Sequence, residues 1–318
     1  MIKKTDCKRL KKRYYPFSDF LQKKFGEAVY KISLNAGVSC PNRDGTKGIN
    51  GCAFCNNEAF SPAIAYQNLS IQKQLETGIE RFQRKRKKIK KFIAYFQSFS
   101  NTYAPSEKLE KLYESALEIP DIAGIAVGTR PDCLEDDKLE VIKTLAQKTH
   151  FWLEIGLETS FNQTLSKINR GHTYEEFLES YEKARKIKNL FICIHLIHGL
   201  PGESKEMMLD TVRKINQLKP DAVKFHQLEI VRGTLFEKWY QEKKITLLSI
   251  DQYMDVLADS LALLSPDIVI QRLFGFTPSS FLIAPELDLK ESSLSLFEKY
   301  LEEKQIYQGV YHENKKVF

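Results

Sequence analysis

Residues 190–218 read LFICIHLIHGLPGESKEMMLDTVRKINQL, an apolar run followed by a loop rich in glycine and proline and then an amphipathic stretch. The run from Leu190 to Ile197 is short and rich in isoleucine and leucine, which is typical of a buried parallel strand. In the amphipathic stretch, apolar residues recur on one face of a helix, namely Met208, Val212, Ile215 and Leu218. This stretch therefore predicts one unit of strand, loop and helix.

The same alternation continues along most of the chain. Further runs rich in isoleucine, valine, phenylalanine and tyrosine are predicted to be strands at 29–34, 92–96, 124–127, 151–155, 222–228 and 267–273. Helical patterns lie between them, at 109–117 and 139–145, and a further helix is predicted at 251–264. Alternation over this length predicts an α/β fold with a parallel sheet, either open or closed into a barrel.

Polar or glycine-rich loops follow six of the predicted strands in turn. They are the loop 40–55, Gln97–Ser98, Gly128–Asp132, Glu158–Thr159, His198–Glu203 and His226–Gln227. Because function gathers at the carboxyl ends of parallel strands in such folds, we expect these loops to face one shared cavity.

The composition is that of a globular protein. Of the 318 residues, 42% are hydrophobic and 28% are charged, and this length is ordinary for a single α/β barrel. The formal net charge of +7 permits a polyanionic partner. The basic N-terminus is not followed by an apolar stretch and no apolar run is long enough to span a bilayer, so we expect a soluble, cytoplasmic protein with no membrane partner.

Three of the six cysteines are clustered, at positions 40, 52 and 55. In a reducing compartment, clustered thiols are more often metal or redox ligands than disulfide partners. A structural zinc site would need a fourth ligand, whereas a [4Fe–4S] cluster held by three thiolates would leave one iron open. The spacing alone leaves both possibilities standing. Cys7, Cys133 and Cys193 show no ligand spacing, so we expect no second cluster.

Six motifs resemble, in this order, those of the radical S-adenosylmethionine (SAM) superfamily. The usual triad of that superfamily is C-x-x-x-C-x-x-C, and the first gap here is longer. The longer gap resembles the stand-alone YhcC-like branch, which is related to the catalytic domain of Elongator. The likeness extends from about residue 25 to about residue 285. It is carried by the segments CPNRDGTKGINGCAFCNNEAFSP (40–62), AYFQSFSNTYAP (94–105), GTRPDC (128–133), INRGH (168–172), HLIHGLPGE (195–203) and KFHQL (224–228).

The resemblance implies a partial TIM-type barrel of β/α units. It assigns residues 25–264 to the radical SAM core, residues 1–24 to a basic N-terminal extension and residues 265–318 to a C-terminal extension packed on the barrel. It also implies that Cys40, Cys52 and Cys55 hold a [4Fe–4S] cluster whose open iron binds SAM. An electron from a donor such as flavodoxin or ferredoxin would then cleave SAM to methionine and a 5′-deoxyadenosyl radical, which abstracts hydrogen from a substrate.

The resemblance also suggests which side chains surround SAM. Gln97 stands where many members have a turn that binds the SAM amino group, Arg130 could pair with its carboxylate or with a substrate phosphate, and Glu158 stands where relatives have a glutamine. The predicted SAM-binding residues are Phe54, Gln97, Ser98, Thr129, Arg130, Glu158, Arg170, Ile197 and Gly199. The predicted substrate residues are His198, His226 and Gln227.

Relatives that modify the side chain of the tRNA wobble uridine make tRNA the expected substrate. Two basic segments could bind RNA, residues 8–15 and residues 84–91, because cations neutralise phosphates and aromatic rings stack on bases. In the first segment the predicted RNA-binding residues are Lys8, Arg9, Lys11, Lys12 and Arg13. The alternatives are a radical SAM enzyme acting on a small metabolite or peptide, and a zinc-stabilised nucleic-acid-binding protein without catalysis.

Overall fold

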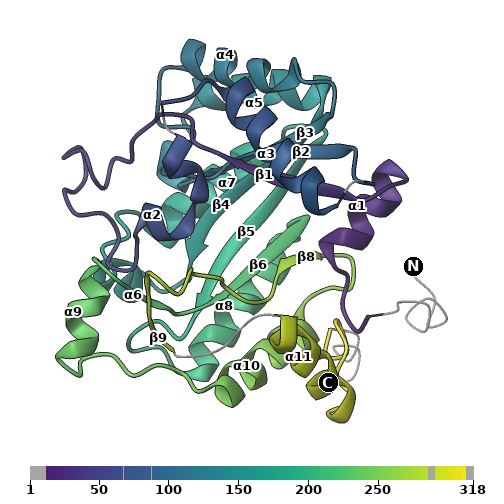
Figure 1. Cartoon of the computed structure of the whole chain (residues 1–318). Helices are drawn as coiled ribbons and strands as arrows, with labels where there is room; N and C mark the ends of the chain where they lie inside the picture. Colours follow the sequence, from purple (N-terminus) through teal and green to yellow (C-terminus); the bar gives the residue numbers. More distant parts are fainter. Residues whose placement is uncertain (1–11, 67, 87, 286–290, 313–318) are drawn as a thin grey trace.

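The computed structural model describes residues 12–66, 68–86, 88–285 and 291–312. Its centre is a sheet of seven parallel strands in the order β1-β2-β3-β4-β5-β6-β8, with β1 and β8 at the two edges (Figure 1). This curved, open sheet confirms the predicted partial TIM-type barrel. The strands are β1 (Val29–Leu34), β2 (Lys91–Phe96), β3 (Ile122–Thr129), β4 (His150–Glu158), β5 (Leu190–His198), β6 (Ala222–Gln227) and β8 (Val269–Arg272).

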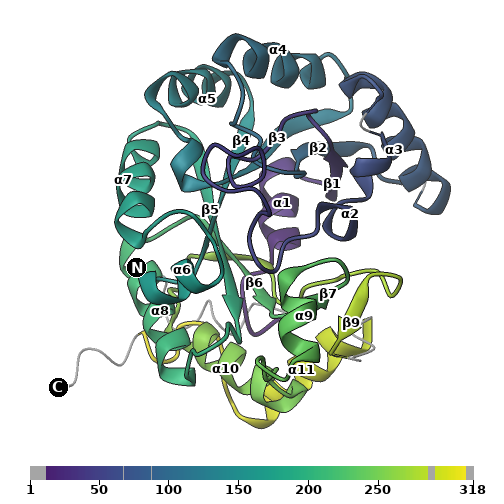
Figure 2. The ribbon, with the colours of Figure 1, turned by 90° about the vertical axis from the view of Figure 1, so that its left-hand side faces the viewer.

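Helices cover the outer face of this sheet, and Figure 2 shows α4, α5, α7, α8 and α10 arranged around the strands. Side chains that accept backbone N–H groups fix where several of them begin; Thr173 and Glu176, for example, form a capping box at the start of α7. The apolar helix faces pack on the outward side chains of the strands and form the main core. These helices are α3 (Ile71–Lys85), α4 (Ser106–Leu117), α5 (Asp136–Lys148), α7 (Tyr174–Arg185), α8 (Lys205–Leu218) and α10 (Ile250–Leu263).

The amino ends of the strands are covered by α1 (Phe17–Phe25), a helix within the predicted basic extension. The rings of Phe17 and Phe20 meet Trp152 edge-on, at 5.3 and 5.5 Å between ring centroids. Leu21 packs with inward-facing apolar residues from several strands, including Ile93. Figure 1 shows α1 and α2 (Asn57–Phe60) at opposite ends of the strands. Access to the barrel interior is therefore from the carboxyl end and from the gap between β1 and β8.

Shorter elements surround the carboxyl end of the barrel. β7 and β9 form a separate antiparallel pair, while β8 pairs with β6 although it lies in the segment predicted as a C-terminal extension. In the described part of the chain, no helix combines the length and apolar character that a bilayer-spanning segment needs. The remaining elements are η2 (Pro62–Tyr66), η3 (Pro131–Cys133), α6 (Asn162–Lys167), β7 (Ile230–Val231), α9 (Leu235–Gln241), β9 (Leu282–Ala284) and α11 (Glu291–Glu303).

Alternate residues of each strand point into the barrel, because successive side chains in a strand face opposite ways. In β4 the inward series is Trp152, Glu154 and Gly156, running from the end covered by α1 toward the carboxyl end. The first layer is apolar, as Trp152 illustrates, and the second contains Glu154. This layering places charged side chains in the interior of the barrel, above an apolar base.

Candidate active site

The carboxyl ends of the strands surround one cavity, with about 1340 Å³ of empty space including its solvent-open mouth. All three clustered cysteines line it. So do nine of the residues predicted to bind cofactor or substrate: Phe54, Gln97, Thr129, Arg130, Glu158, Arg170, Ile197, His226 and Gln227. The expectation that these strand ends face one cavity is therefore confirmed for most of them.

The loop that carries the cysteines leaves β1 and is fastened to the end of α6. Ala53 donates its N–H to the carbonyl of Ile168 at 2.9 Å, and Asn169 Nδ2 donates to the carbonyl of Gly51 at 2.8 Å. Gly51 has a φ of +74°, and a Cβ there would lie 2.9 Å from Nε of Arg43. Arg43 in turn donates from Nη2 to the carbonyl of Cys55 at 2.6 Å. These contacts fix the loop over the cavity.

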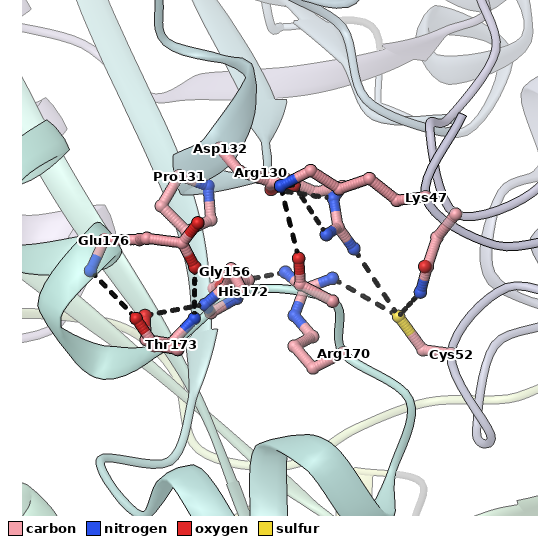
Figure 3. Close-up of polar contacts among 12 residues, drawn as sticks. Lys47, Cys52, Arg130, Pro131, Asp132, Gly156, Arg170, His172, Thr173 and Glu176 are labelled. Carbon is pink, nitrogen blue, oxygen red and sulfur yellow. Dashed lines mark hydrogen bonds and ion pairs between the residues drawn. The ribbon is translucent and has the colours of Figure 1, made fainter.

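Cys52 is buried, and three N–H donors from separate parts of the chain point at its sulfur (Figure 3). The distances to Sγ are 3.4 Å from Arg170 Nη1, 3.6 Å from Asn42 Nδ2 and 3.9 Å from Arg130 Nη1. Donors and positive charge around a sulfur stabilise its thiolate form. The INRGH and GTRPDC motifs therefore meet at the cysteine.

The side chain of Arg130 is 3% exposed, which excludes a solvated surface role. Its Nε and Nη2 donate to the two carboxylate oxygens of Asp132, both at 2.9 Å. Although burial acts to raise it, these hydrogen bonds and one from Lys47 hold the pKa of Asp132 below its ordinary value. The guanidinium edge that we expected to pair with an outside anion is thus paired with Asp132, and Nη1 faces Cys52.

Arg170 is held by the end of β4. Its Nη2 donates to the carbonyl of Gly156 at 2.6 Å and lies 3.3 Å from Oε1 of Glu158. Burial raises the pKa of Glu158, while Arg170 and Arg130 oppose that rise. A Cβ on residue 156 would lie 2.5 Å from Nη2 of Arg170, so only glycine leaves room for the arginine to reach Cys52.

Gln97 lies on the cavity wall next to the β1 edge. Its Oε1 accepts from Ser33 Oγ at 2.9 Å, and its Nε2 donates to the carbonyl of Phe60 at the same distance. An amide oxygen has two lone pairs, so Oε1 retains the capacity to accept from an ammonium group. Ser100 Oγ and Arg170 Nε, both in residues that line the cavity, are buried and have no hydrogen-bond partner among the described residues. The site thus has polar groups available to a ligand.

Three predicted residues do not line the cavity. The hydroxyl of Ser98 is bonded to Ser61 at 2.9 Å, and Gly199 donates its N–H to the sulfur of Met208. His198 is buried with Nε2 at 3.0 Å from the hydroxyl of Ser260, and its ring packs on Phe225. Burial lowers the pKa of His198 to about 3, so it is neutral at physiological pH.

The two basic segments are described only in part. Lys8, Arg9 and Lys11 lie outside the described residues. Lys12 is 3.4 Å from Glu298, and Nη1 of Arg13 donates to the carbonyl of Ile306 at 3.5 Å. In the second segment, Arg86 donates to the hydroxyl of Tyr30 at 2.6 Å.

Sequence reasoning identified Glu154 as a candidate paired core carboxylate but missed the two lysines that pair with it deeper in the barrel. Glu154 is fully buried and accepts hydrogen bonds from Lys31, Lys224 and His195. Burial acts to raise its pKa, but the two lysines hold the pKa well below its ordinary value. Burial lowers the pKa of Lys224 to about 8 and that of His195 to about 4. The signal was present, because a lysine or glutamate is exceptional in a strand buried on both faces.

Among the described residues, no three histidine, cysteine, aspartate or glutamate side chains converge on a point that could hold a single metal ion. A zinc ion needs such convergence, whereas a [4Fe–4S] cluster binds each thiolate through a different iron atom. Three thiols lining one cavity, with N–H donors directed at one of them, fit a cluster. Burial raises the pKa of Cys55 to about 11, with Cys52 adding to the rise and Arg43 opposing it, so cluster binding must displace a proton there.

The chain belongs to the radical SAM superfamily, whose sequence profile matches residues 39–215, more than half of its length. The profile of the Radical_SAM C-terminal domain matches residues 220–303. The chain is thus a radical SAM enzyme, a class whose members use a [4Fe–4S] cluster and SAM. Both the class and the predicted superfamily are confirmed.

The similar proteins include YtqA of Bacillus subtilis (strain 168), described as uncharacterized. It is 36% identical over 299 residues, covering 94% of this chain and 92% of YtqA. Protein YhcC of Escherichia coli (strain K12) is 34% identical over 278 residues, 87% of this chain and 88% of that protein, which confirms the predicted branch.

More distant comparisons reach proteins with larger chains. A tRNA uridine(34) acetyltransferase of Methanocaldococcus jannaschii is 30% identical over 138 residues, covering 42% of this chain and 24% of that enzyme. The solved structure of Methanocaldococcus infernus Elp3 with an N-terminal deletion superposes with a TM-score of 0.69 at 16% identity. It covers 90% of this chain and 67% of Elp3. Identity this low demonstrates a shared fold and nothing further.

Proposed function

We propose that Cys40, Cys52 and Cys55 bind a [4Fe–4S] cluster with one open iron, and that SAM binds beside it in the cavity. The observation that carries this proposal is the convergence of Asn42 and two buried arginines on the sulfur of Cys52. When bound, the cluster supplies the one-electron cleavage of the C5′–S bond of SAM. Flavodoxin or ferredoxin is the proposed electron donor, and the cytoplasm the proposed compartment.

The chain's own residues have defined tasks in this proposal. Arg130 and Arg170 donate to the Cys52 sulfur, and the carboxylates of Asp132 and Glu158 hold the two arginines in position. Gln97 Oε1 accepts from the SAM ammonium. Phe54, Thr129 and Ile197 form further cavity wall for SAM.

The experiment is anaerobic reconstitution with iron and sulfide, followed by reduction in the presence of SAM. We expect about four iron atoms per chain and slow formation of 5′-deoxyadenosine without any substrate. Replacing Gln97 by Ala should retain the iron but weaken SAM binding by about 1–3 kcal/mol, the cost of a buried ammonium left without its partner. Unchanged SAM affinity in that variant would show that Gln97 does not bind the SAM ammonium group.

For the substrate, we propose tRNA, with the wobble uridine side chain as the modified group and His226 and Gln227 on the substrate side. Support comes from the partial likeness to a tRNA uridine(34) acetyltransferase and from the net charge of +7. Deleting the gene in its host and comparing all modified tRNA nucleosides by mass spectrometry tests this assignment. An unchanged nucleoside profile would redirect the search to small metabolites or peptides.

RNA binding can be tested separately through its salt dependence. Each phosphate neutralised contributes about 0.7–0.9 to the slope of log affinity against log salt. Replacing Lys8, Arg9, Lys11, Lys12 and Arg13 by Gln should weaken tRNA binding and flatten that slope by at least about two units. Replacing the exposed Lys108 and Lys111 of α4 serves as the control. Wild-type protein that fails to retain tRNA at low salt would refute the RNA assignment alone.

A further inference from the structure

The cavity contains more positive than negative side chains. Three carboxylates line it, those of Glu154, Glu158 and Glu229. Five cationic side chains line it as well: Arg43, Arg130, Arg170, Lys224 and Arg272. Arg130 and Arg170 pair with carboxylates at the cysteine end, and Arg43 binds a backbone carbonyl. At the inner end, Lys224 and Arg272 stand on adjacent strands beside Glu154 and Glu229, and Lys31, which pairs with Glu154 from the neighbouring lateral cavity, makes three cations against two carboxylates.

At the inner end, two lysines share one carboxylate. Lys31 donates to Oε1 of Glu154, and Lys224 and His195 donate to Oε2. Lys31 also donates to Gln271 Oε1 at 2.7 Å, and Lys224 is 3.2 Å from the hydroxyl of Tyr95. Each ammonium group has three N–H donors, so each keeps one for a further acceptor.

Arg272 adds a third cation, whose charge opposes the rise that burial causes in the pKa of the neighbouring Glu229. It is the register partner of Lys224 across β6 and β8, and it lines both the main cavity and the lateral cavity between β1 and β8. The hydrogen bonds to Glu229 come from Gln227 at 3.0 Å and Thr277 at 2.6 Å. Among the described hydrogen bonds none involves Arg272, which is partly exposed and lines both cavities.

Three cations beside two carboxylates, Glu154 and Glu229, leave a net positive charge that is costly to bury, because an unpaired charge loses its hydration without a compensating partner. Lys224 is 4% exposed, so water alone does not compensate for it. A purely structural network would balance its charges, as the two arginines near Cys52 do with Asp132 and Glu158. An anion that enters the cavity would supply the missing charge.

We propose that Lys224 and Arg272, together with Lys31 from the neighbouring lateral cavity, form a subsite for an oxyanion of the substrate, a carboxylate or a phosphate, at the inner end of the cavity. The neutral rings of His195 and His226 lie beside it, 5.7 Å apart between centroids, and add hydrogen-bonding groups. This subsite rests on the proposed function, since it would hold a substrate next to SAM. It defines the substrate class: a molecule or side chain that carries an oxyanion and can reach the interior of the barrel.

The test is isothermal titration calorimetry on the reconstituted full-length protein, with acetate and inorganic phosphate as separate probes at constant ionic strength. Both Arg272→Gln and Lys224→Met should weaken binding of the preferred probe at least about tenfold, the effect of removing one charged hydrogen-bond donor. Lys148→Gln is the matched control, because it removes the same charge from an exposed ion pair with Glu114. Circular dichroism establishes that each variant is folded.

Preference for acetate would indicate a substrate carboxylate, and preference for phosphate would indicate a phosphoryl group. Failure of wild type to bind either probe, or equal binding by both cavity variants, would overturn the subsite. SAM cleavage by the wild-type protein is measured in the same preparation. If the protein cleaves SAM but binds neither oxyanion, only the proposed subsite is wrong. If it binds an oxyanion but does not cleave SAM, the result counts against the proposed function.

Discussion

The two ends of the cavity use positive charge differently. At the cysteine end, Arg130 and Arg170 each have a carboxylate partner and direct a further N–H at the sulfur of Cys52. At the inner end, Lys31 and Lys224 share Glu154, and Arg272 is hydrogen-bonded to no described residue. The first arrangement is balanced and suits a thiolate, whereas the second retains positive charge and suits an anion from outside. One cavity thus combines a site for a cofactor with a site for part of a substrate.

Loss of a cysteine should have the largest effect, because it removes a ligand at the balanced end. Replacing Cys40, Cys52 or Cys55 by Ala is expected to abolish iron retention and SAM cleavage, as measured by iron and sulfide analysis after reconstitution. Cys133→Ala and Cys193→Ala are the controls, since both thiols are buried and neither lines the cavity. Loss of iron in Cys133→Ala would contradict the assignment of Cys40, Cys52 and Cys55 as the cluster ligands.

The inner end can be tested through stability. Glu154→Gln leaves the buried Lys224 and the partly buried Lys31 without their shared partner and should lower the free energy of unfolding by about 3–5 kcal/mol, measured by denaturant titration. Adding Lys224→Met should recover part of this loss. The free energy of unfolding of the double variant should differ from the sum of the two single effects by about 0.5–3 kcal/mol. Glu140→Gln, in an exposed pair with Lys143, is the control. Strict additivity of the two inner substitutions would show that they do not act as one network.

The Gly156→Ala variant tests whether the cysteine end of the cavity needs Arg170 to reach Cys52. The added Cβ would meet Arg170 Nη2 at 2.5 Å and push the guanidinium away from Cys52. We expect a loss of about 1–3 kcal/mol in unfolding free energy and a lower iron content after reconstitution. Gly128→Ala, where the nearest atom to a Cβ is 3.4 Å away, is the matched control. Normal iron retention in Gly156→Ala would show that the contact of Arg170 with Cys52 is not needed for cluster binding.

The smallest expected effect is on pH dependence at the inner end. Burial lowers the pKa of Lys224 to about 8, so acetate binding should weaken as pH rises from about 7 to about 9.5 and the ammonium loses its charge. The unfolded chain still binds that proton, so the Lys224 contribution to unfolding free energy should rise between about pH 8 and pH 10.5.

The neighbouring histidine, tyrosine, cysteine and glutamate side chains keep their protonation state over this pH range. Burial lowers the pKa of His195 to about 4 and the pKa of His226 well below its ordinary value, so both stay neutral. Burial raises the pKa values of Tyr95 and Cys193, and Glu154 stays ionised. Lys31 and Arg272 face the same space as cations. Lys224→Arg keeps its charge over this range, so a fall in acetate affinity in that variant would contradict the assignment to Lys224.

The two ends of the cavity also differ in how much of them could be predicted from the sequence. Strand β1 was predicted at 29–34 and lies at Val29–Leu34, because a short β-branched run between turn signals has few alternatives. The cysteine end was predictable because its residues stand in contiguous motifs. Convergence of Arg130 and Arg170 on one sulfur was not predictable, since it depends on how two loops pack in space.

The inner end was harder to predict for a physical reason. Lys31, Glu154 and Lys224 belong to three strands, and their pairing depends on strand register, which one sequence does not specify for parallel strands. His198 illustrates the converse. It stands beside the glycine-rich loop, but its side chain turns outward to Ser260 on α10, because alternate strand residues face opposite sides of the sheet.

The most direct measurement is electron paramagnetic resonance of the reduced, reconstituted protein before and after SAM is added. Three cysteine ligands leave one iron of the cluster without a protein ligand, so SAM should change the spectrum of the reduced cluster and be cleaved to 5′-deoxyadenosine. The Cys52→Ala protein should give no cluster signal. A wild-type spectrum that SAM leaves unchanged, with no 5′-deoxyadenosine formed, would contradict the proposed cluster and its open iron.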